Sequence, residues 1–393
     1  MQPLMISIGG TFWDSYIYRG RLYLWNLDGS LEVYRWDELI DSLPNRQEDI
    51  LAFRCGFSRN DYLYGYDFSL LFNDIEIKEM LLNKFNRVYL EYDLSRNKEE
   101  LHPFLFGKQN NPFRELPSDI EIFKNNLYVI NDDGFFSTTA HRKNPKYPVS
   151  SRPRKLWDCP VYAIRAGNNR VALAAGDEGL FEYETADEPY WVMNNSKLVS
   201  IDNDIYQLSS NHSSVAQWNY SSIFSSSYVD VSFMAAFKWE ERELVFKDLI
   251  YQSLIFGESG FSWGLQDKIY IVTKRGLDVR RFVQSNLGTD KTAFEPLQSV
   301  EYTDWQGDIV GGGVGLFGTI VETDNALFVF QSNNEVFHIN GPITRWRVFP
   351  RSIRYENQLH VILKDRINIY SFNHDYFVDQ KQKNAGIIYR KPR

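Results

Sequence analysis

Residues 19–36 read RGRLYLWNLDGSLEVYRW and carry the pattern that decides the fold. A turn pair, Arg19-Gly20, precedes the apolar run Leu22-Tyr23-Leu24, and a second turn, Asp28-Gly29, leads into Leu31 to Tyr34. Gly, Asn and Asp favour tight hairpins because they adopt the left-handed backbone conformation at little cost. The segment therefore predicts a strand, a hairpin and a second strand.

The same unit recurs along the chain, with a polar turn before each apolar run. Clear copies centre on Leu22-Tyr23-Leu24, Leu127-Tyr128-Val129, Ile269-Tyr270-Ile271 and Leu327-Phe328-Val329, and weaker copies on Val171-Ala172-Leu173, Ile205-Tyr206-Gln207 and Leu359-His360-Val361. Successive side chains of a strand point to opposite faces, so both faces of these strands are apolar. Strands buried on both faces are typical of stacked propeller blades. A β-sandwich, the alternative fold, predicts polar residues where the Tyr and Phe side chains stand.

We therefore expect an all-β fold, with residues 1–393 forming a single closed β-propeller of seven blades, or alternatively eight. Near the C-terminus, Arg354-Tyr355, Leu359 to Leu363 and Ile367 to Phe372 supply three strands. Leu4 to Ile8 supplies the fourth and closes the ring without a free sheet edge.

The repeat is interrupted by insertions in the region from Asp61 to Pro117, which is a candidate for another divergent blade. Ile77, Leu81 and Phe85 recur at helical spacing, so we expect a helix over Asp74 to Phe85, followed by a strand over Asn86 to Tyr92.

One copy resembles a known superfamily. Residues 29–37, GSLEVYRWD, look like the third strand of a WD40-like β-propeller repeat, which ends in Trp-Asp. The sequence has no Gly-His pair, and its other Trp-Asp pairs, at 13–14 and 157–158, fall elsewhere in the repeat. The resemblance implies the propeller fold and a scaffolding role, and it assigns no functional residue.

Composition narrows the class of protein. The two cysteines, Cys55 and Cys159, are too few for a disulfide framework, and the first ten residues are too short for a secretory signal, so we expect a cytoplasmic protein. No apolar run reaches the roughly 20 residues of a membrane-spanning helix. The net charge of −8 disfavours a nucleic-acid binder, except through a local contact.

No catalytic, metal or cofactor motif emerges, so we expect no enzyme activity and no cofactor. Residues 313–318, GVGLFG, match G-x-G-x-x-G, but a dinucleotide loop needs a helix at its third glycine and Thr319 to Thr323 read as a strand. We interpret the glycines as a flexible connection between blades. The six histidines lack metal-ligand spacing, and Asn131 to Gly134 fit a hairpin turn better than a calcium loop.

A basic segment, residues 141–156, contrasts with the acidic chain. Prolines at 145, 148 and 153 predict an exposed, extended loop. Its candidate partner-binding residues are Arg142, Lys143, Lys146, Tyr147, Arg152, Arg154 and Lys155. Residues 381–393 form a second basic segment, the C-terminal tail.

The sequence thus favours a non-enzymatic scaffold or regulatory subunit that binds one or more proteins, with an acidic surface as the expected contact. The alternative is a propeller enzyme or small-ligand binder with a site at the central channel mouth. Buried titratable groups with perturbed pKa values in the channel would favour the alternative. The oligomeric state, the partner and the pathway stay open.

Overall fold

The structure is a computed structural model of the chain. It describes residues 2–64, 71, 74–140, 143–167, 170–175, 180–185, 198–202, 213–218, 221–227, 232–240, 243–251, 260–265, 268–283, 293–331, 335–350, 352 and 354–372.

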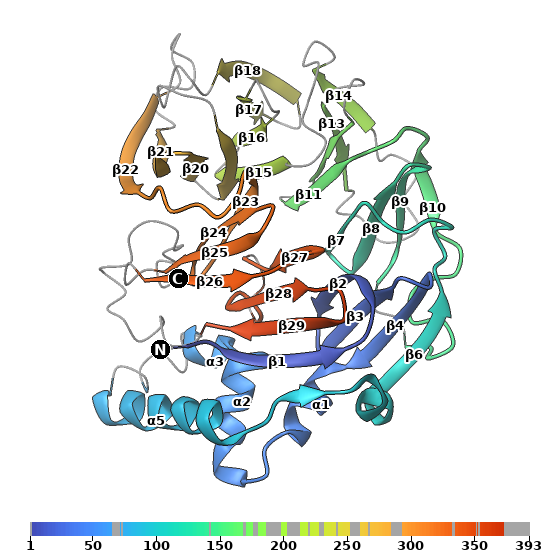
Figure 1. The fold of residues 1–393 in the computed structure, drawn as a ribbon. Helices are drawn as coiled ribbons and strands as arrows, with labels where there is room; N and C mark the ends of the chain where they lie inside the picture. The colour runs from blue at the N-terminus through green and yellow to red at the C-terminus, as the bar shows by residue number, and fades with distance from the viewer. Residues whose placement is uncertain are drawn as a thin grey trace.

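The described strands form seven sheets, here called I to VII (Figure 1). Sheet I holds β2 (Phe12–Tyr18), β3 (Arg21–Asn26), β4 (Ser30–Arg35) and β6 (Leu105–Asn110). Sheet II holds β7 (Asp119–Phe123), β8 (Asn126–Asn131), β9 (Gly134–Thr139) and β10 (Arg154–Trp157). Sheet III holds β11 (Ala163–Gly167), β12 (Arg170–Ala174), β13 (Leu180–Glu184) and β14 (Leu198–Asp202). Sheet IV holds β15 (Ser213–Trp218), β16 (Ser221–Ser227), β17 (Ser232–Glu240) and β18 (Glu243–Tyr251).

Three further sheets follow in the chain, and the last of them also includes strands from the N-terminal region. Sheet V holds β19 (Phe261–Leu265), β20 (Lys268–Thr273), β21 (Gly276–Val283) and β22 (Ala293–Glu301). Sheet VI holds β23 (Ile309–Gly315), β24 (Gly318–Thr323), β25 (Ala326–Gln331) and β26 (Val336–Asn340). Sheet VII holds β27 (Arg345–Val348), β28 (Gln358–Ile362), β29 (Arg366–Ser371), β1 (Leu4–Gly9) and the short β5 (Ser95–Arg96).

The first strands of successive sheets contact one another. β2 contacts β7, and the series continues through β11, β15, β19 and β23 to β27, which contacts β2 again. Figure 1 shows the sheets following one another in chain order, from blue through green and yellow to red. The two ends of the chain share sheet VII, where β1 pairs antiparallel with β29 from Leu4 opposite Ser371 to Gly9 opposite Arg366. The first strand of this sheet is Arg345–Val348, so the expectation of a strand at Arg354-Tyr355 was wrong.

Most predicted repeat copies fall on the second strand of a sheet: β3, β8, β12, β20 and β28. The copy at Leu327 to Val329 lies on β25, the third strand of sheet VI, so Phe328 is not equivalent in position to the three tyrosines. The copy at Ile205 to Gln207 lies outside the described residues.

The aromatic side chains of the clear copies are buried, as predicted: Tyr23, Tyr128, Tyr270 and Phe328 are at most 2% exposed. Tyr23 reaches sheet II, where its hydroxyl donates to the carbonyl of Ala140 at 3.1 Å. Tyr128 packs against Tyr183 of sheet III with the ring centroids 6.3 Å apart. These contacts between sheets explain why both faces of the strands are apolar.

The insertion inside sheet I is helical. It comprises α1 (Trp36–Ser42), η1 (Gln47–Asp49), α2 (Ile50–Phe57), α3 (Asp61–Tyr64), α5 (Ile75–Glu91) and η3 (Lys98–Phe104). The described residues between 61 and 117 add only β5 and β6 to the sheets, so the expected extra blade was wrong. The predicted strand over Asn86 to Tyr92 was also wrong. The helix α5 begins at Ile75, is capped by the side chain of Asp74 and continues to Glu91, because Val88 extends the buried face of Leu81 and Phe85.

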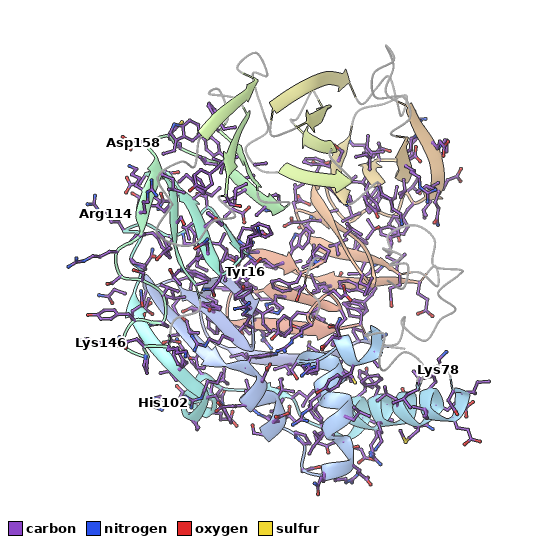
Figure 2. The ribbon with its side chains drawn as sticks, turned by 180° about the vertical axis from the view of Figure 1, so that it is seen from behind. Tyr16, Lys78, His102, Arg114, Lys146 and Asp158 are labelled. Atoms are coloured by element: carbon purple, nitrogen blue, oxygen red, sulfur yellow. The ribbon has the colours of Figure 1, made fainter. Side chains whose placement is uncertain are left out.

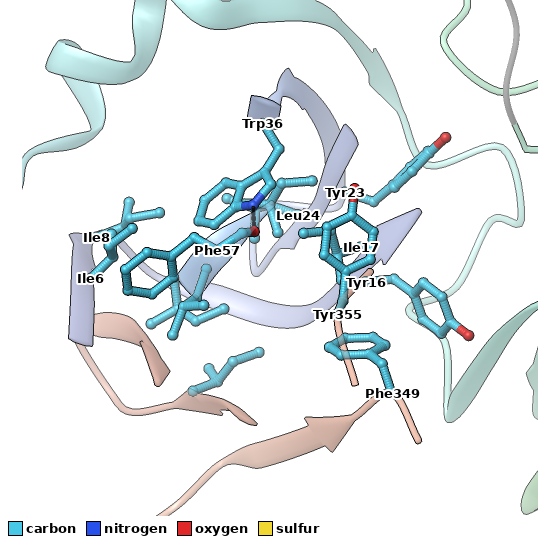
Figure 3. Packing of buried hydrophobic residues seen from close by; sticks show 14 of the residues in the cluster. Ile6, Ile8, Tyr16, Ile17, Tyr23, Leu24, Trp36, Phe57, Phe349 and Tyr355 are labelled. Carbon is cyan, nitrogen blue, oxygen red and sulfur yellow. Dashed lines mark hydrogen bonds between the residues drawn. The ribbon is translucent and has the colours of Figure 1, made fainter. Parts of the chain in front are cut away.

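Trp36 shows how the helices attach to the sheet. The strand that resembles a WD40 repeat ends at Arg35, and Trp36 starts α1. Its fully buried indole Nε1–H donates to the carbonyl of Phe57 at 2.6 Å, joining α1 to the end of α2 (Figure 3). Nearby, Tyr16 of β2 meets Phe349 edge-on at 5.3 Å, which packs sheet I against sheet VII.

A search of the described helices found none that is both long and apolar enough to cross a membrane.

Candidate functional site

The basic segment connects β9 to β10 along the edges of sheets I and II. Lys143, Lys146, Arg152, Arg154 and Lys155 are exposed, and we call these five residues the basic edge. Figure 2 places Lys146 and Asp158 on the same side of the molecule. Arg142 lies outside the described residues, as does the basic tail, residues 381–393. The loop ends at Pro153, so Arg154 and Lys155 belong to strand β10 rather than to the predicted loop.

The segment is anchored although its cations are exposed. Pro148 and Val149 are buried, and the backbone N–H of Val149 donates to Oε1 of Gln109 at 3.4 Å. Gly107 of β6 lies so close that a Cβ there would meet the carbonyl oxygen of Pro145 at 2.0 Å. Tyr147 is half-buried, with the Lys146 ammonium 5.5 Å from its ring centre. The backbone therefore holds the basic edge in a defined place.

The exposed cations differ in their pairing. Lys155 forms an ion pair with Asp158 and lies 5.7 Å from the ring centre of Phe136. The other four residues of the basic edge form no ion pair within the part of the chain that the structure describes. Four cations thus keep their charge available to a partner.

A second cluster, which sequence reasoning missed, joins the first strands of four sheets. Arg347 of β27 donates to both carboxylate oxygens of Asp14 on β2 at 2.6 Å and to Asp119 on β7 at 2.9 Å. Arg345 donates to Asp14 at 2.8 Å, and Arg165 of β11 donates to Asp119 at 2.6 Å. We call these five residues the inner ion network.

Burial and charge shift the pKa values of this region. Burial opposes ionisation of Asp119, but Arg165 and Arg347 outweigh it and lower the pKa of Asp119 to about 2. Burial, with the charge of Arg347, lowers the pKa of His360 to about 3. His360 bridges sheets VII and I, because its Nδ1 lies 3.1 Å from Oγ of Ser15 while its Nε2 lies 3.2 Å from Oε1 of Gln358.

The inner ion network fits a structural role better than acid–base catalysis. A general acid or base must change protonation near the working pH, whereas Asp119 stays ionised and His360 stays neutral at pH 7. Both oxygens of Asp14 accept hydrogen bonds from arginine. The residues of the inner ion network lie up to 333 positions apart in the chain, so no local sequence motif could have predicted them.

The glycine-rich stretch forms an inner strand, β23, and its hairpin with β24, rather than the expected flexible connection. A Cβ on Gly312 would meet the Trp263 indole at 2.3 Å, and one on Gly313 would meet the Trp346 indole at 2.8 Å. The glycines thus make room for indoles from β19 and β27. Among the described residues, no group of His, Cys, Asp and Glu has the arrangement of a metal site.

Comparison with known proteins supports the fold. No family model and no curated protein matches the chain. The β-propeller domain of Cps50 (Swd1) from Myceliophteria thermophila is similar in structure, with a TM-score of 0.51 and 8% identity over 94% of this chain and 99% of that one. The structure of BBS1N in complex with ARL6DN has a TM-score of 0.49 and 9% identity over 95% and 96% of the two chains. The chain is a divergent β-propeller, as the WD40-like resemblance implied, and no particular family within that class is identified.

Proposed function

We propose that the chain is a closed, seven-bladed β-propeller that acts as a non-enzymatic scaffold and binds an acidic surface of a protein partner through the basic edge. The observation that carries the proposal is a set of four exposed, unpaired cations on an anchored backbone, in a protein of net charge −8. A cation cluster held in place attracts an acidic partner and orients it on approach.

The arrangement of the sheets supports the propeller part of the proposal. Seven sheets, continuous contacts between their first strands and the β1–β29 pairing favour a closed ring of seven blades over eight. Tyr147, beside Lys146, adds an aromatic surface for the partner. In this proposal, any contact with nucleic acid is confined to the basic edge. A cytoplasmic location is part of the proposal and rests on the low cysteine content.

The test compares the natural chain with a variant carrying Arg152→Glu, Arg154→Glu and Lys155→Glu. Both proteins are used to capture partners from the native cell, and the captured proteins are quantified by mass spectrometry. We expect a defined set of proteins with acidic surfaces to be lost with the variant. The matched control reverses three exposed cations elsewhere, Lys274, Arg275 and Lys364, and should keep the set. Equal capture by all three proteins contradicts the proposal.

The inner ion network favours a second candidate function, the binding of a small anion near the first strands. Arg165 and Arg345 each use only Nη1 for hydrogen bonds within the described part of the chain, so their other N–H groups can receive an anion. Thermal denaturation with added phosphate or malonate tests this function. A rise in melting temperature that Arg165→Gln removes would support it, and no rise with either anion contradicts it.

A further inference from the structure

The stretch that contains helix α5 carries half of the large apolar side chains that are exposed in the described part of the chain. Ten such side chains are exposed there, and five of them lie between Leu71 and Leu90. Ile75 and Leu90 are the most exposed of the ten, at 70% and 78%. Single exposed apolar residues are ordinary on a protein surface, whereas a group of them is typical of a contact site.

These apolar residues lie on the outer side of α5. The helix buries Leu81, Phe85 and Val88 against the rest of the protein. With a turn of about 100° per residue, Leu90 lies opposite this buried side and Ile75 lies on the adjoining flank. We call this surface the outer strip of α5. Figures 1 and 2 show α5 at the periphery of the molecule.

The start of the outer strip is acidic. Asp74, Glu76 and Glu79 are exposed and form no ion pair within the described part of the chain, and Lys78 is the one cation in residues 74–79. The carboxylates alone define no site. Beside an apolar strip, however, they favour an occupant that is both apolar and basic.

The C-terminal tail, residues 381–393, has this composition. It contains the apolar run Ile387-Ile388-Tyr389, and it has no Asp or Glu. Cations stand on both sides of that run, at Lys381, Lys383, Arg390, Lys391 and Arg393. The tail therefore matches the outer strip in both apolar character and charge.

The end of the described chain lies within reach of α5. Strand β29 ends at Ser371, which is opposite Leu4 of β1, and β1 in turn contacts α5. Paired strands are only about 5 Å apart. Eight residues, 373–380, separate Phe372 from the tail, and an extended chain of this length spans about 26 Å.

We propose that the C-terminal tail docks along the outer strip of α5, with its apolar run on the strip and its cations near the carboxylates at the start of the helix. Because the tail belongs to the same chain, its effective concentration at α5 is on the order of 1 mM, so a weak contact is enough to keep it docked. This contact lies beyond the proposed function and does not depend on the basic edge.

The first test measures how fast trypsin cleaves the full chain at the start of the tail, with mass spectrometry as the readout. We expect Ile75→Gln, Leu90→Gln to raise the rate about tenfold, a difference of about 1.4 kcal/mol in docking. The melting temperature should stay unchanged because both side chains are exposed. The matched control Tyr162→Gln, Leu297→Gln removes two exposed apolar side chains elsewhere and should leave the cleavage rate unchanged.

The second test uses a fluorescein-labelled peptide with the sequence of residues 381–393 and fluorescence anisotropy. The full chain with Ile387→Gln, Ile388→Gln should bind this peptide about tenfold more tightly than the natural chain, because its own tail competes less. Adding Ile75→Gln, Leu90→Gln to that chain should remove the gain.

The charge match is tested with the same peptide and the chain whose own tail is weakened. Glu76→Gln, Glu79→Gln should weaken binding several-fold at low salt and less at high salt, since salt screens exposed charges. The matched control Glu99→Gln, Glu115→Gln changes exposed glutamates elsewhere and should bind the peptide as before.

Two results overturn the proposal. One is equal cleavage of the tail in the natural chain and in the Ile75, Leu90 variant, together with peptide binding that this variant retains. The other is a dimer of the natural chain, measured by light scattering, that the same variant converts to a monomer, because the outer strip would then be covered by a second copy of the chain.

Discussion

The first strands of neighbouring sheets are held together in two different ways. Where sheets VII, I and II meet, Arg347 is bonded to Asp14 and Asp119. Where sheets V and VI meet, Gly312 lies against the Trp263 indole with no space for a Cβ. The first contact depends on paired charges and the second on shape.

The difference predicts how each junction fails. A charge that loses its partner inside a protein stays desolvated and unpaired, and the folded state carries that penalty in full. An overfilled contact between rings and backbone can relax by small movements, so its penalty is smaller. We therefore expect substitutions in the inner ion network to cost more stability than substitutions at the glycine junction.

The largest effect is expected for Asp14→Ala. Arg347, whose side chain is only 10% exposed, would lose its main carboxylate, and Arg345 would lose its pair as well. Breaking a buried ion pair from one side costs about 3 to 5 kcal/mol, measured as the free energy of unfolding in urea. Asp365→Ala, which breaks an exposed pair with Arg366, should cost at most about 1 kcal/mol. Equal losses would mean that the inner ion network is as solvated as the surface pair.

Gly312→Ala should have the next largest effect, because the added Cβ would overlap the rigid Trp263 indole. Overpacking of this kind costs about 1 to 3 kcal/mol. Gly311→Ala is the matched control, since its Cβ would meet only the Glu322 side chain, with Oε2 at 3.0 Å and Cβ at 3.8 Å, and no indole ring. If both variants unfold at the same urea concentration, shape is not what holds the V–VI junction.

The pH dependence of stability distinguishes the contact between sheets VII and I, which contains His360, from the glycine contact between sheets V and VI. His360 binds a proton near pH 6.5 in the unfolded chain but only near pH 3 when folded, because burial lowers its pKa. The unfolded state thus holds more protons between these values, and stability falls as the pH falls from about 6.5 to 3.

His360 contributes at most about 1.4 kcal/mol per pH unit to this slope. His360→Gln should remove that contribution, so its free energy of unfolding should depend less on pH between 6 and 4 than that of the natural chain. Parallel pH profiles for the two proteins would show that His360 is not buried in its neutral form.

The sequence predicted the features that depend on neighbouring residues. Tyr23, Tyr128 and Tyr270 were expected to be buried because each lies between aliphatic residues after a turn, and all three are. The same local reasoning failed at residues 86–92, where apolar and polar residues fit a strand as well as a helix. The N-cap at Asp74 and the position of Val88 on the buried face of α5 favour the helix.

The candidate sites show the same difference between features formed by residues near in sequence and features formed only on folding. The basic segment could be recognised because its cations lie close together in sequence, although the buried anchor at Val149 could not. The inner ion network was invisible, since Asp14 and Arg347 are brought together only when the last sheet packs on the first.

The smallest effect on stability is expected at the basic edge, where the arginines are exposed to solvent, whereas the Arg347 side chain is only 10% exposed. Arg152 and Arg154 are exposed, and Lys155 pairs only with the solvent-exposed Asp158. Exposed charges contribute about 0 to 1 kcal/mol each to folding, so reversing all three to Glu should shift the urea midpoint little.

The same variant should associate more slowly with an acidic partner and should lose the salt dependence of that rate, because long-range attraction between exposed charges is screened by salt. Stopped-flow association at low and high salt measures both quantities. A large loss of stability would mean that these side chains stabilise the fold, as Arg347 does. An unchanged association rate would mean that the basic edge has no role in binding.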